Sequence, residues 1–307
     1  MTVEVRGVAH VNVNCSSLAR STAFYRETLE LDIVAHTCPS EPQDGTGFGL
    51  PGRARWDAHM LCDARGFAAP ALDLLEWLEP LPVGAPHAEP HHLGFYRLCF
   101  LATDLDARYE SLRSRGIECL SEPLDVPLGS SVADSVRALC FRDPDGTVLE
   151  LVERSEGAVE AVHVNINCSD IARSHEWYER VLGLRTFGSS APGPVPGTLF
   201  GISGEIEWDA RFLLPPEGGQ LAVDLLEWKR PTPVGAPAAR ANQLGIFRMA
   251  FLVGDAQEAH AELSRQGVEA APPVFLDMGP EIPVDGVWAV FFRDPDGTCL
   301  EFIQNPA

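Results

Sequence analysis

Histidine and glutamate, which are common in metal and acid–base chemistry, recur in the same order in both halves of the chain, each time with an arginine between the two glutamates. The first half carries His10, Glu76, Arg97 and Glu150, and the second half carries His163, Glu227, Arg248 and Glu301. Imidazole and carboxylate groups ligate divalent metals and transfer protons. A guanidinium stays protonated, so it cannot ligate a metal, but it can pair with carboxylates or hold an acidic group of a ligand.

These residues lie within longer motifs that occur twice. "VAHVNVNC" at Val8 matches "AVHVNINC" at Ala161, and "DLLEWLEPLPVGAP" at Asp73 matches "DLLEWKRPTPVGAP" at Asp224. "CFRDPDGTVLEL" likewise matches "FFRDPDGTCLEF" near the end of each half. A short polar stretch, "RSEG" at 154–157, joins the halves. The sequence therefore predicts two domains, residues 1–154 and 158–307, produced by a tandem duplication.

Each half divides again into two smaller units. "HVNVN" alternates apolar and polar residues as a half-buried strand does, and the following "SSLARSTAFYRETLEL" has helical spacing with Ser16 or Ser17 as its cap. "ALDLLEWL" and "YRLCFLA" are expected strands, and "DLDARYESLRSRG" is an expected helix capped by Asp104. Two strands joined by Asp-Pro-Asp-Gly close the half. The pattern predicts an α+β chain of four βαβββ modules.

Composition excludes several classes of protein. The net charge is −21 and no basic stretch offsets it, which argues against binding to nucleic acids or anionic membranes. No run approaches the ~20 apolar residues of a membrane span, and no signal peptide is evident at the N-terminus. The eight cysteines form no CxxC pair, which favours reduced thiols. We expect a cytoplasmic protein with a small-molecule ligand.

The motifs "HVNVNCSSLARSTAFYRETLEL" and "FRDPDGTVLELVE" resemble the opening and closing elements of a module of the glyoxalase/bleomycin resistance protein/dioxygenase (vicinal oxygen chelate) superfamily. In that family two modules pair, and their sheets curl into an open cup that holds a metal. The resemblance implies two glyoxalase-like, cup-shaped (half-barrel) domains, one in each half of this chain. Four modules can complete two cups in one chain, so a monomer or a homodimer is expected.

The resemblance also implies roles for the recurring residues. The implied ligands of a divalent metal (Zn, Fe, Ni, Mn or Co) are His10, Glu76 and Glu150 in the first half and His163, Glu227 and Glu301 in the second. The implied catalytic residues are Glu227, Glu301 and Arg248. The implied ligand-contacting residues are Arg97, Arg248, Trp208 and Trp228.

Arginine departs from the family's metal set in both halves. The glyoxalase I pattern implies His/Gln, Glu, His/Gln and Glu, whereas Arg97 and Arg248 stand at its third position. Extradiol dioxygenase chemistry is disfavoured, because Arg248 replaces the second histidine that it requires. An alternative is that Arg97 pairs with Glu76 and Glu150 and fills the place of the metal, or holds a carboxylate or phenolate of a ligand.

Two functions follow from these observations. The first is a metal-dependent lyase, isomerase or oxygenase that acts on a small oxygenated metabolite, and the sequence leans towards this enzyme. The alternative is a non-catalytic protein with a metal-free cup that sequesters a metabolite or an antibiotic, as resistance proteins do. Fold resemblance alone does not decide between them.

Overall fold

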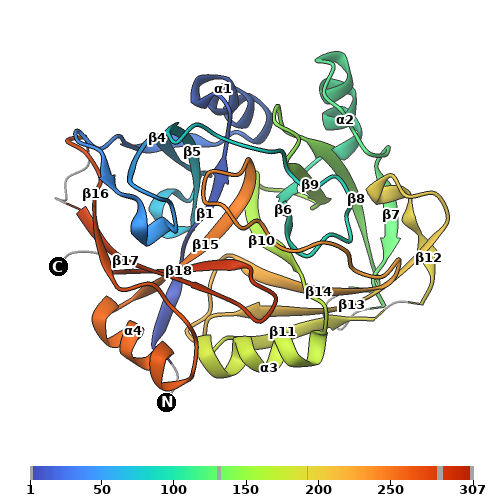
Figure 1. The fold of residues 1–307 in the computed structure, drawn as a ribbon. Coiled ribbons are helices and arrows are strands. Elements are labelled where there is room, and N and C mark those ends of the chain that lie inside the picture. Colours follow the sequence, from blue (N-terminus) through green and yellow to red (C-terminus); the bar gives the residue numbers. More distant parts are fainter. Residues whose placement is uncertain (1–2, 130–132, 192, 282–285, 305–307) are drawn as a thin grey trace.

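The computed structural model describes residues 3–129, 133–191, 193–281 and 286–304, and it has the four expected modules (Figure 1). Module 1 comprises β1 (Val5–Asn14), α1 (Leu18–Leu29), β2 (Asp32–Thr37), β3 (Gln43–Asp44), η1 (Gly45–Phe48), β4 (Arg53–Cys62), η2 (Gly66–Ala68) and β5 (Ala71–Glu79). Module 2 comprises β6 (Gly94–Ala102), α2 (Leu105–Ser114), β7 (Leu124–Pro127), β8 (Ser135–Arg142) and β9 (Val148–Glu153). Module 3 comprises β10 (Glu160–Asn167), α3 (Ile171–Leu182), β11 (Arg185–Ser190), β12 (Val195–Pro196), η3 (Gly197–Phe200), β13 (Glu205–Leu214) and β14 (Ala222–Arg230). Module 4 comprises β15 (Gly245–Val253), α4 (Ala256–Arg265), β16 (Val274–Asp277), β17 (Gly286–Arg293) and β18 (Cys299–Gln304).

The local signals in the sequence produce the expected elements. The side chain of Ser17 accepts a hydrogen bond from the backbone N–H of Arg20 and begins α1, and Asp104 accepts from Ala107 and begins α2. These caps satisfy N–H groups that have no partner inside the helix. The predicted α+β class with four modules is confirmed.

Each sheet combines one module of the first repeat with one module of the second. Strand β1 pairs antiparallel with β15, so modules 1 and 4 form one sheet in the order β16-β17-β18-β15-β1-β5-β4-β2. Strand β10 pairs with β6, so modules 2 and 3 form the other in the order β11-β13-β14-β10-β6-β9-β8-β7. In Figure 1 the red and orange C-terminal strands accordingly lie beside the blue N-terminal ones. We call these sheets the first cup and the second cup.

The expectation that each half forms its own cup is therefore wrong. The division into 1–154 and 158–307 remains a description of the repeat, while the cups join modules from different repeats. Connector lengths explain this exchange. Six residues, 154–159, separate β9 from β10, which keeps module 3 in the sheet of module 2. The longer connectors 80–93 and 231–244 cross to the other sheet and bond to one another, as Val83 N–H does to Asn242 O at 2.9 Å.

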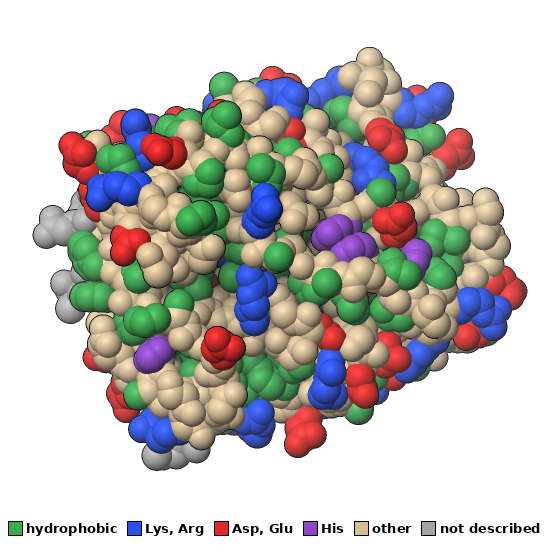
Figure 2. All heavy atoms as spheres, viewed as in Figure 1, with side chains coloured by type: hydrophobic (Ala, Val, Ile, Leu, Met, Phe, Trp, Pro, Cys, Tyr) green, Lys and Arg blue, Asp and Glu red, His purple; other side chains and the backbone are tan. Residues whose placement is uncertain are grey.

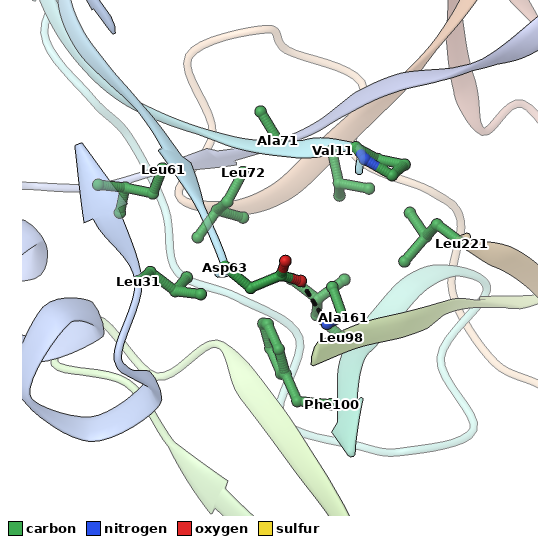
Figure 3. Close-up of a pocket in the computed structure, with 11 residues that line it drawn as sticks. Val11, Leu31, Leu61, Asp63, Ala71, Leu72, Leu98, Phe100, Ala161 and Leu221 are labelled. Carbon is green, nitrogen blue, oxygen red and sulfur yellow. Dashed lines mark hydrogen bonds between the residues drawn. The ribbon is translucent and has the colours of Figure 1, made fainter. Parts of the chain in front are cut away.

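One hydrophobic core joins the two cups. The four α-helices pack on the outer faces of the sheets, and their buried side chains form a single cluster that includes Tyr25, Tyr178 and Leu263. Between the sheets, the carboxylate of Asp63 accepts a hydrogen bond from the N–H of Ala161, at 3.2 Å (Figure 3). The gap beside this bond measures about 10 Å³, which is room for about one water molecule and not for a ligand.

The Asp-Pro-Asp-Gly turns hold the two modules of one repeat together. The hydroxyl of Tyr25 on α1 donates to Asp143 Oδ2 at 3.0 Å, and Tyr178 on α3 donates to Asp294 Oδ2 at the same distance. Asp145 in the first turn also accepts from the N–H and hydroxyl of Ser16. The motif conserved between the repeats thus has a structural role, which is to dock each closing hairpin on the first helix.

Replacing Tyr25 with phenylalanine is expected to lower the free energy of unfolding by about 1–3 kcal/mol, because Asp143 Oδ2 then lacks its buried donor. Tyr178→Phe should have a similar effect in the second repeat. The measurement is urea unfolding, with Tyr109→Phe as a control that changes a partly buried ring packed against the edge of the core. If Tyr25→Phe is no less stable than the control, this bond does not hold the modules together.

Candidate functional site

Four polar side chains meet inside the first cup, one from each of four neighbouring strands. They are His10 on β1, Asp73 on β5, Arg248 on β15 and Glu301 on β18. Arg248 donates from Nε to Glu301 Oε2 and from Nη2 to Asp73 Oδ2, both at 2.8 Å. His10 Nε2 lies 3.4 Å from Glu301 Oε2 and 3.9 Å from Asp73 Oδ2. All four side chains are buried, so the arginine is the cation that compensates two buried carboxylates.

The second cup repeats this arrangement. Arg97 donates to Glu150 Oε2 and Asp224 Oδ2, again at 2.8 Å each. His163 Nε2 lies 3.5 Å from Glu150 Oε2. The guanidinium of Arg97 also lies over the ring of Phe200, 5.3 Å from its centroid. Because module 2 pairs with module 3, every such cluster contains residues of both repeats.

The charge of the arginine lowers the pKa values of the buried glutamates. Burial alone would raise the pKa of Glu150, but the charge of Arg97 and the contact with His163 outweigh it and lower the pKa to about 2. The pKa of Glu301 is lowered in the same way, against its burial, by Arg248 and His10. Both glutamates are therefore ionised at neutral pH and remain acceptors for the arginine.

The first cup contains a large cavity next to this cluster. The cavity measures about 900 Å³ and is lined by His10, Asp73, Arg248 and Glu301 together with apolar side chains, among them Phe48, Trp56, Met60, Leu75, Leu276 and Ile303. Two buried atoms of the cluster, His10 Nε2 and Arg248 Nη1, have no hydrogen-bond partner. Buried polar atoms are rarely left unpaired, so the oxygen of a ligand or of a water is expected beside them.

Glu76 and Glu227 do not lie in the cups, and the expectation that they join the histidines there is wrong. Glu76 accepts the N–H of Leu18 at 2.6 Å, and Glu227 accepts the N–H of Ile171 at 3.0 Å. Both therefore serve the first turns of α1 and α3, on the outer faces of the sheets. Side chains alternate along a strand, so Glu76 faces away from its neighbour Trp77, which packs inside the cup.

Asp73 and Asp224, which were not among the predicted site residues, take the expected places of those glutamates. The signal was present, because Asp73, Leu75 and Trp77 are two residues apart and share one face of β5. Asn12 Nδ2 on β1 donates to Asp73 Oδ2 at 3.1 Å and fixes its orientation. Asn165 makes the matching contact with Asp224 at 3.3 Å. The asparagines of the repeated "HVNVN" and "HVNIN" motifs thus position the carboxylates.

The two tryptophans predicted to touch a ligand are buried inside the second cup. Trp228 donates from Nε1 to Asn167 Oδ1 at 3.2 Å, and Trp208 donates to Ser190 Oγ at 3.1 Å. Their contact with a ligand stays a prediction. The counterpart of Trp208 in the first cup, Trp56, lines the large cavity.

The comparisons with known proteins agree with this architecture. The family model of the Glyoxalase/Bleomycin resistance protein/Dioxygenase superfamily matches residues 7–151 and 161–302. The chain belongs to this superfamily. Glyoxalase I from Zea mays shares the fold with a TM-score of 0.67 at 17% identity, over 97% of this chain and 92% of that one. A putative dioxygenase from Bacillus subtilis has a TM-score of 0.60 at 16% identity, over 100% and 87% of the two chains.

Sequence similarity to curated relatives is limited to part of the chain. Lactoylglutathione lyase GLX1 from Arabidopsis thaliana is 30% identical over 92 residues, which are 30% of this chain and 31% of the relative. The uncharacterized protein YwkD from Bacillus subtilis is 26% identical over 143 residues, which are 47% of this chain and 94% of YwkD. The match to the lyase thus spans about a third of that relative's length.

Members of the superfamily commonly bind a divalent metal, but the first cup does not offer a metal site. The oxygens Asp73 Oδ2 and Glu301 Oε2 already accept from Arg248, whose fixed positive charge would repel a metal ion. Among the described residues, His10, Asp73 and Glu301 do not bring three ligand atoms within 4.8 Å of one another. Cys99, Glu150 and His163 do so in the second cup, yet there Arg97 is bonded to Glu150.

Other features of the surface bear on partners. On the face in Figure 2, lysine and arginine side chains are scattered among acidic ones and form no broad basic patch. In the part of the chain that the structure describes, every helix is too short or too polar to cross a membrane.

Replacing Arg248 with methionine is expected to lower the free energy of unfolding by about 3–5 kcal/mol, because Asp73 and Glu301 then stay buried without a cation. Chemical denaturation measures this loss. A double variant that adds Glu301→Gln should recover part of it. Arg137→Met, which removes a surface ion pair with Asp106, is the control and should cost much less. Equal losses in the two single variants would contradict a compensating role for Arg248.

The Arg97–Glu150 pair should make the free energy of unfolding depend on pH in the acidic range. A carboxyl group whose pKa is lower in the folded than in the unfolded state stabilises the fold above its unfolded pKa, and this contribution is lost as the pH falls through the folded pKa. For Glu150 that window runs from 4.5 down to about 2. Glu150→Gln should therefore be less stable than wild type at pH 7, with a gap that narrows as the pH falls from 4.5 to about 2. A gap independent of pH would contradict the assignment.

Proposed function

We propose that the first cup is a metal-independent binding site for an uncharged small molecule with a mainly apolar body and a carbonyl or hydroxyl oxygen. The observation that carries this proposal is the position of Arg248. Two of its nitrogens hold the carboxylates that a metal would need, and its third, Nη1, is buried without a hydrogen-bond partner in a side chain that lines the cavity. The proposal favours the binding and sequestration function over a metal-dependent enzyme.

The charge of the site favours an uncharged oxygen over an anion. The single positive charge of Arg248 is opposed by Asp73 and Glu301, and Glu217 and Glu281 also line the cavity with only Arg6 as a further cation. A ligand carboxylate or phenolate would meet this excess of negative charge in a buried setting, where repulsion is poorly screened. A carbonyl or hydroxyl oxygen can accept from Arg248 Nη1 without that repulsion.

The size and lining of the cavity support a drug-sized, largely apolar ligand. A volume of about 900 Å³ is at the upper end of the range for small-molecule sites, and such sites are mostly apolar with a few placed polar groups. Phe48 and Trp56 supply aromatic surface on which a flat ring could stack. His10 Nε2 offers a second polar contact beside Arg248.

The names of the relatives suggest metal-assisted catalysis, which this site supports less well than ligand binding. The Arabidopsis relative is named a lactoylglutathione lyase, and the notional counterpart here would be a metal-assisted lyase, isomerase or oxygenase. With arginine bonded to both carboxylates, we assign no step to a metal in this cup. Glu301 and Arg248 are proposed to act as the ion pair that presents the Nη1 donor, rather than as metal ligand and catalyst.

A charge series of similar shape tests this proposal. Acetophenone (neutral), benzoate (anionic) and benzyltrimethylammonium (cationic) would be titrated by ligand-observed NMR in the presence of EDTA. We expect acetophenone to bind at least about tenfold more tightly than benzoate. Arg248→Lys keeps one positive charge but replaces the three guanidinium nitrogens with a single ammonium, and it should weaken acetophenone binding about tenfold or more. Arg97→Lys in the second cup is the matched control and should leave binding unchanged.

Three outcomes would contradict the proposal. Binding that is abolished by EDTA and restored by a divalent metal would return the metal to the site. Preference for benzoate would overturn the charge argument. An Arg248→Lys variant that binds as well as wild type would remove Arg248 from the site.

A further inference from the structure

The two edge strands of the first cup, β16 and β2, are brought together by contacts of Asp277 and Gly279 with Gln43 and Cys38, and we call this junction the seam. The sheet begins at β16 and ends at β2, and the residues that end and follow β16 contact the residues that follow β2. The N–H of Asp277, the last residue of β16, donates to Gln43 Oε1 on β3 at 3.2 Å. Gly279 lies against Cys38 with a φ of +87°, and a Cβ there would meet the Cys38 carbonyl oxygen at 2.4 Å. Only glycine permits this close approach.

A group of metal-ligating side chains lies at this seam. Ligand atoms of His36, Cys38 and Asp57 are all within 4.8 Å of one another. One ring nitrogen of His36, Nε2, is 2.6 Å from Asp57 Oδ1, and the other, Nδ1, is 3.1 Å from Glu281 Oε2. The group is separate from the polar cluster of the cup, because His36 pairs across the strands with His59, whose Nδ1 lies 2.9 Å from the hydroxyl of Thr22 on α1, the helix on the outer face. Glu281 also lines the cavity.

We propose that His36, Cys38 and Asp57 bind a transition-metal cation of the zinc class at the seam. Thiolate, imidazole and carboxylate are the usual protein ligands of zinc, and three of them with a water complete a four-coordinate site. Glu281 then accepts the remaining N–H of the His36 ring, as carboxylates behind metal-bound histidines commonly do. The proposal goes beyond ligand binding in the first cup and does not depend on it.

The second repeat supplies an internal comparison. At the positions that match His36 and Cys38 it has Ser189 and Ala191, neither of which is a good metal ligand. Asp209 matches Asp57, and there its carboxylate is paired with Arg211. The first repeat has His59 in place of Arg211, and Asp57 Oδ1 there lies 2.6 Å from His36 Nε2. The carboxylate that an arginine neutralises in one repeat is available to a cation in the other.

The charges around the group also suit a cation. Asp57 and Glu281 are acidic. The other charged or titratable neighbours are His59, whose ring centroid lies 5.1 Å from that of His36, and Arg55. Burial raises the pKa of the Cys38 thiol, and the charge of Arg55 partly opposes this rise. Binding requires a thiolate and a neutral imidazole. The metal therefore displaces the Cys38 thiol proton, and any proton carried on the His36 nitrogen that binds it, into solvent. Both side chains are partly exposed, so an ion can reach them.

Cobalt(II) is the probe that tests this site, because its bond to a thiolate gives a charge-transfer absorption band. The full chain, stripped with a chelator, would be titrated with cobalt(II) and then with zinc(II). We expect a band that saturates at one equivalent and is displaced by zinc. Cys38→Ala should abolish the band, and His36→Ser should weaken binding at least about tenfold. Both changes introduce the residues of the second repeat, so the fold should tolerate them, and circular dichroism would verify this.

Cys99→Ala is the matched control, because Cys99, Glu150 and His163 form the other group of three ligand types within 4.8 Å. The control should keep the full band. The proposal is overturned if wild type gives no thiolate band, if Cys38→Ala retains it, or if Cys99→Ala removes it.

Discussion

The ion pairs of Arg248 with Asp73 and Glu301 determine what the first cup can do. Two buried carboxylates on β5 and β18 require a cation between them, and the arginine of β15 supplies it through two hydrogen bonds of 2.8 Å. Uncompensated, these carboxylates would cost several kcal/mol. Because the cation is part of the chain, we propose that the cup needs no metal and that the buried donor that remains binds a ligand.

The same interaction explains why the chain is built as an exchange between its repeats. Arg248 comes from the second repeat and Asp73 from the first, while Arg97 of the first repeat meets Asp224 of the second. Each arginine pairs with a glutamate of its own repeat and with an aspartate of the other repeat. The helix–turn contacts, such as Tyr25 with Asp143, hold the modules of one repeat together across the two cups. The cups and the repeats are therefore interlocked, and a change in one cup affects residues of both repeats.

Much of the fold could be predicted from the sequence, because its signals are local. The alternation of "HVNVN", the caps Ser17 and Asp104 and the Asp-Pro-Asp-Gly turns each specify structure within a few residues. The pairing of modules depends on contacts more than 200 residues apart, such as β1 with β15, and repeated modules present nearly identical strand edges to one another. In the site, each histidine meets the closing glutamate of the other repeat, His10 with Glu301 and His163 with Glu150, rather than that of its own repeat as expected. Glu76 was wrongly predicted to lie in the cup. Asp73, three residues earlier on β5, is on the opposite face of the strand, and that face lines the cup.

We propose that arginine occupies the place of the metal in both cups. Anomalous diffraction from crystals of the full chain grown with cobalt(II) tests it most directly. The account predicts density for the Arg248 and Arg97 guanidinium groups between their carboxylates and no anomalous peak beside His10 or His163. A cobalt peak bonded to His10 and Glu301, with Arg248 displaced from Asp73, would contradict it.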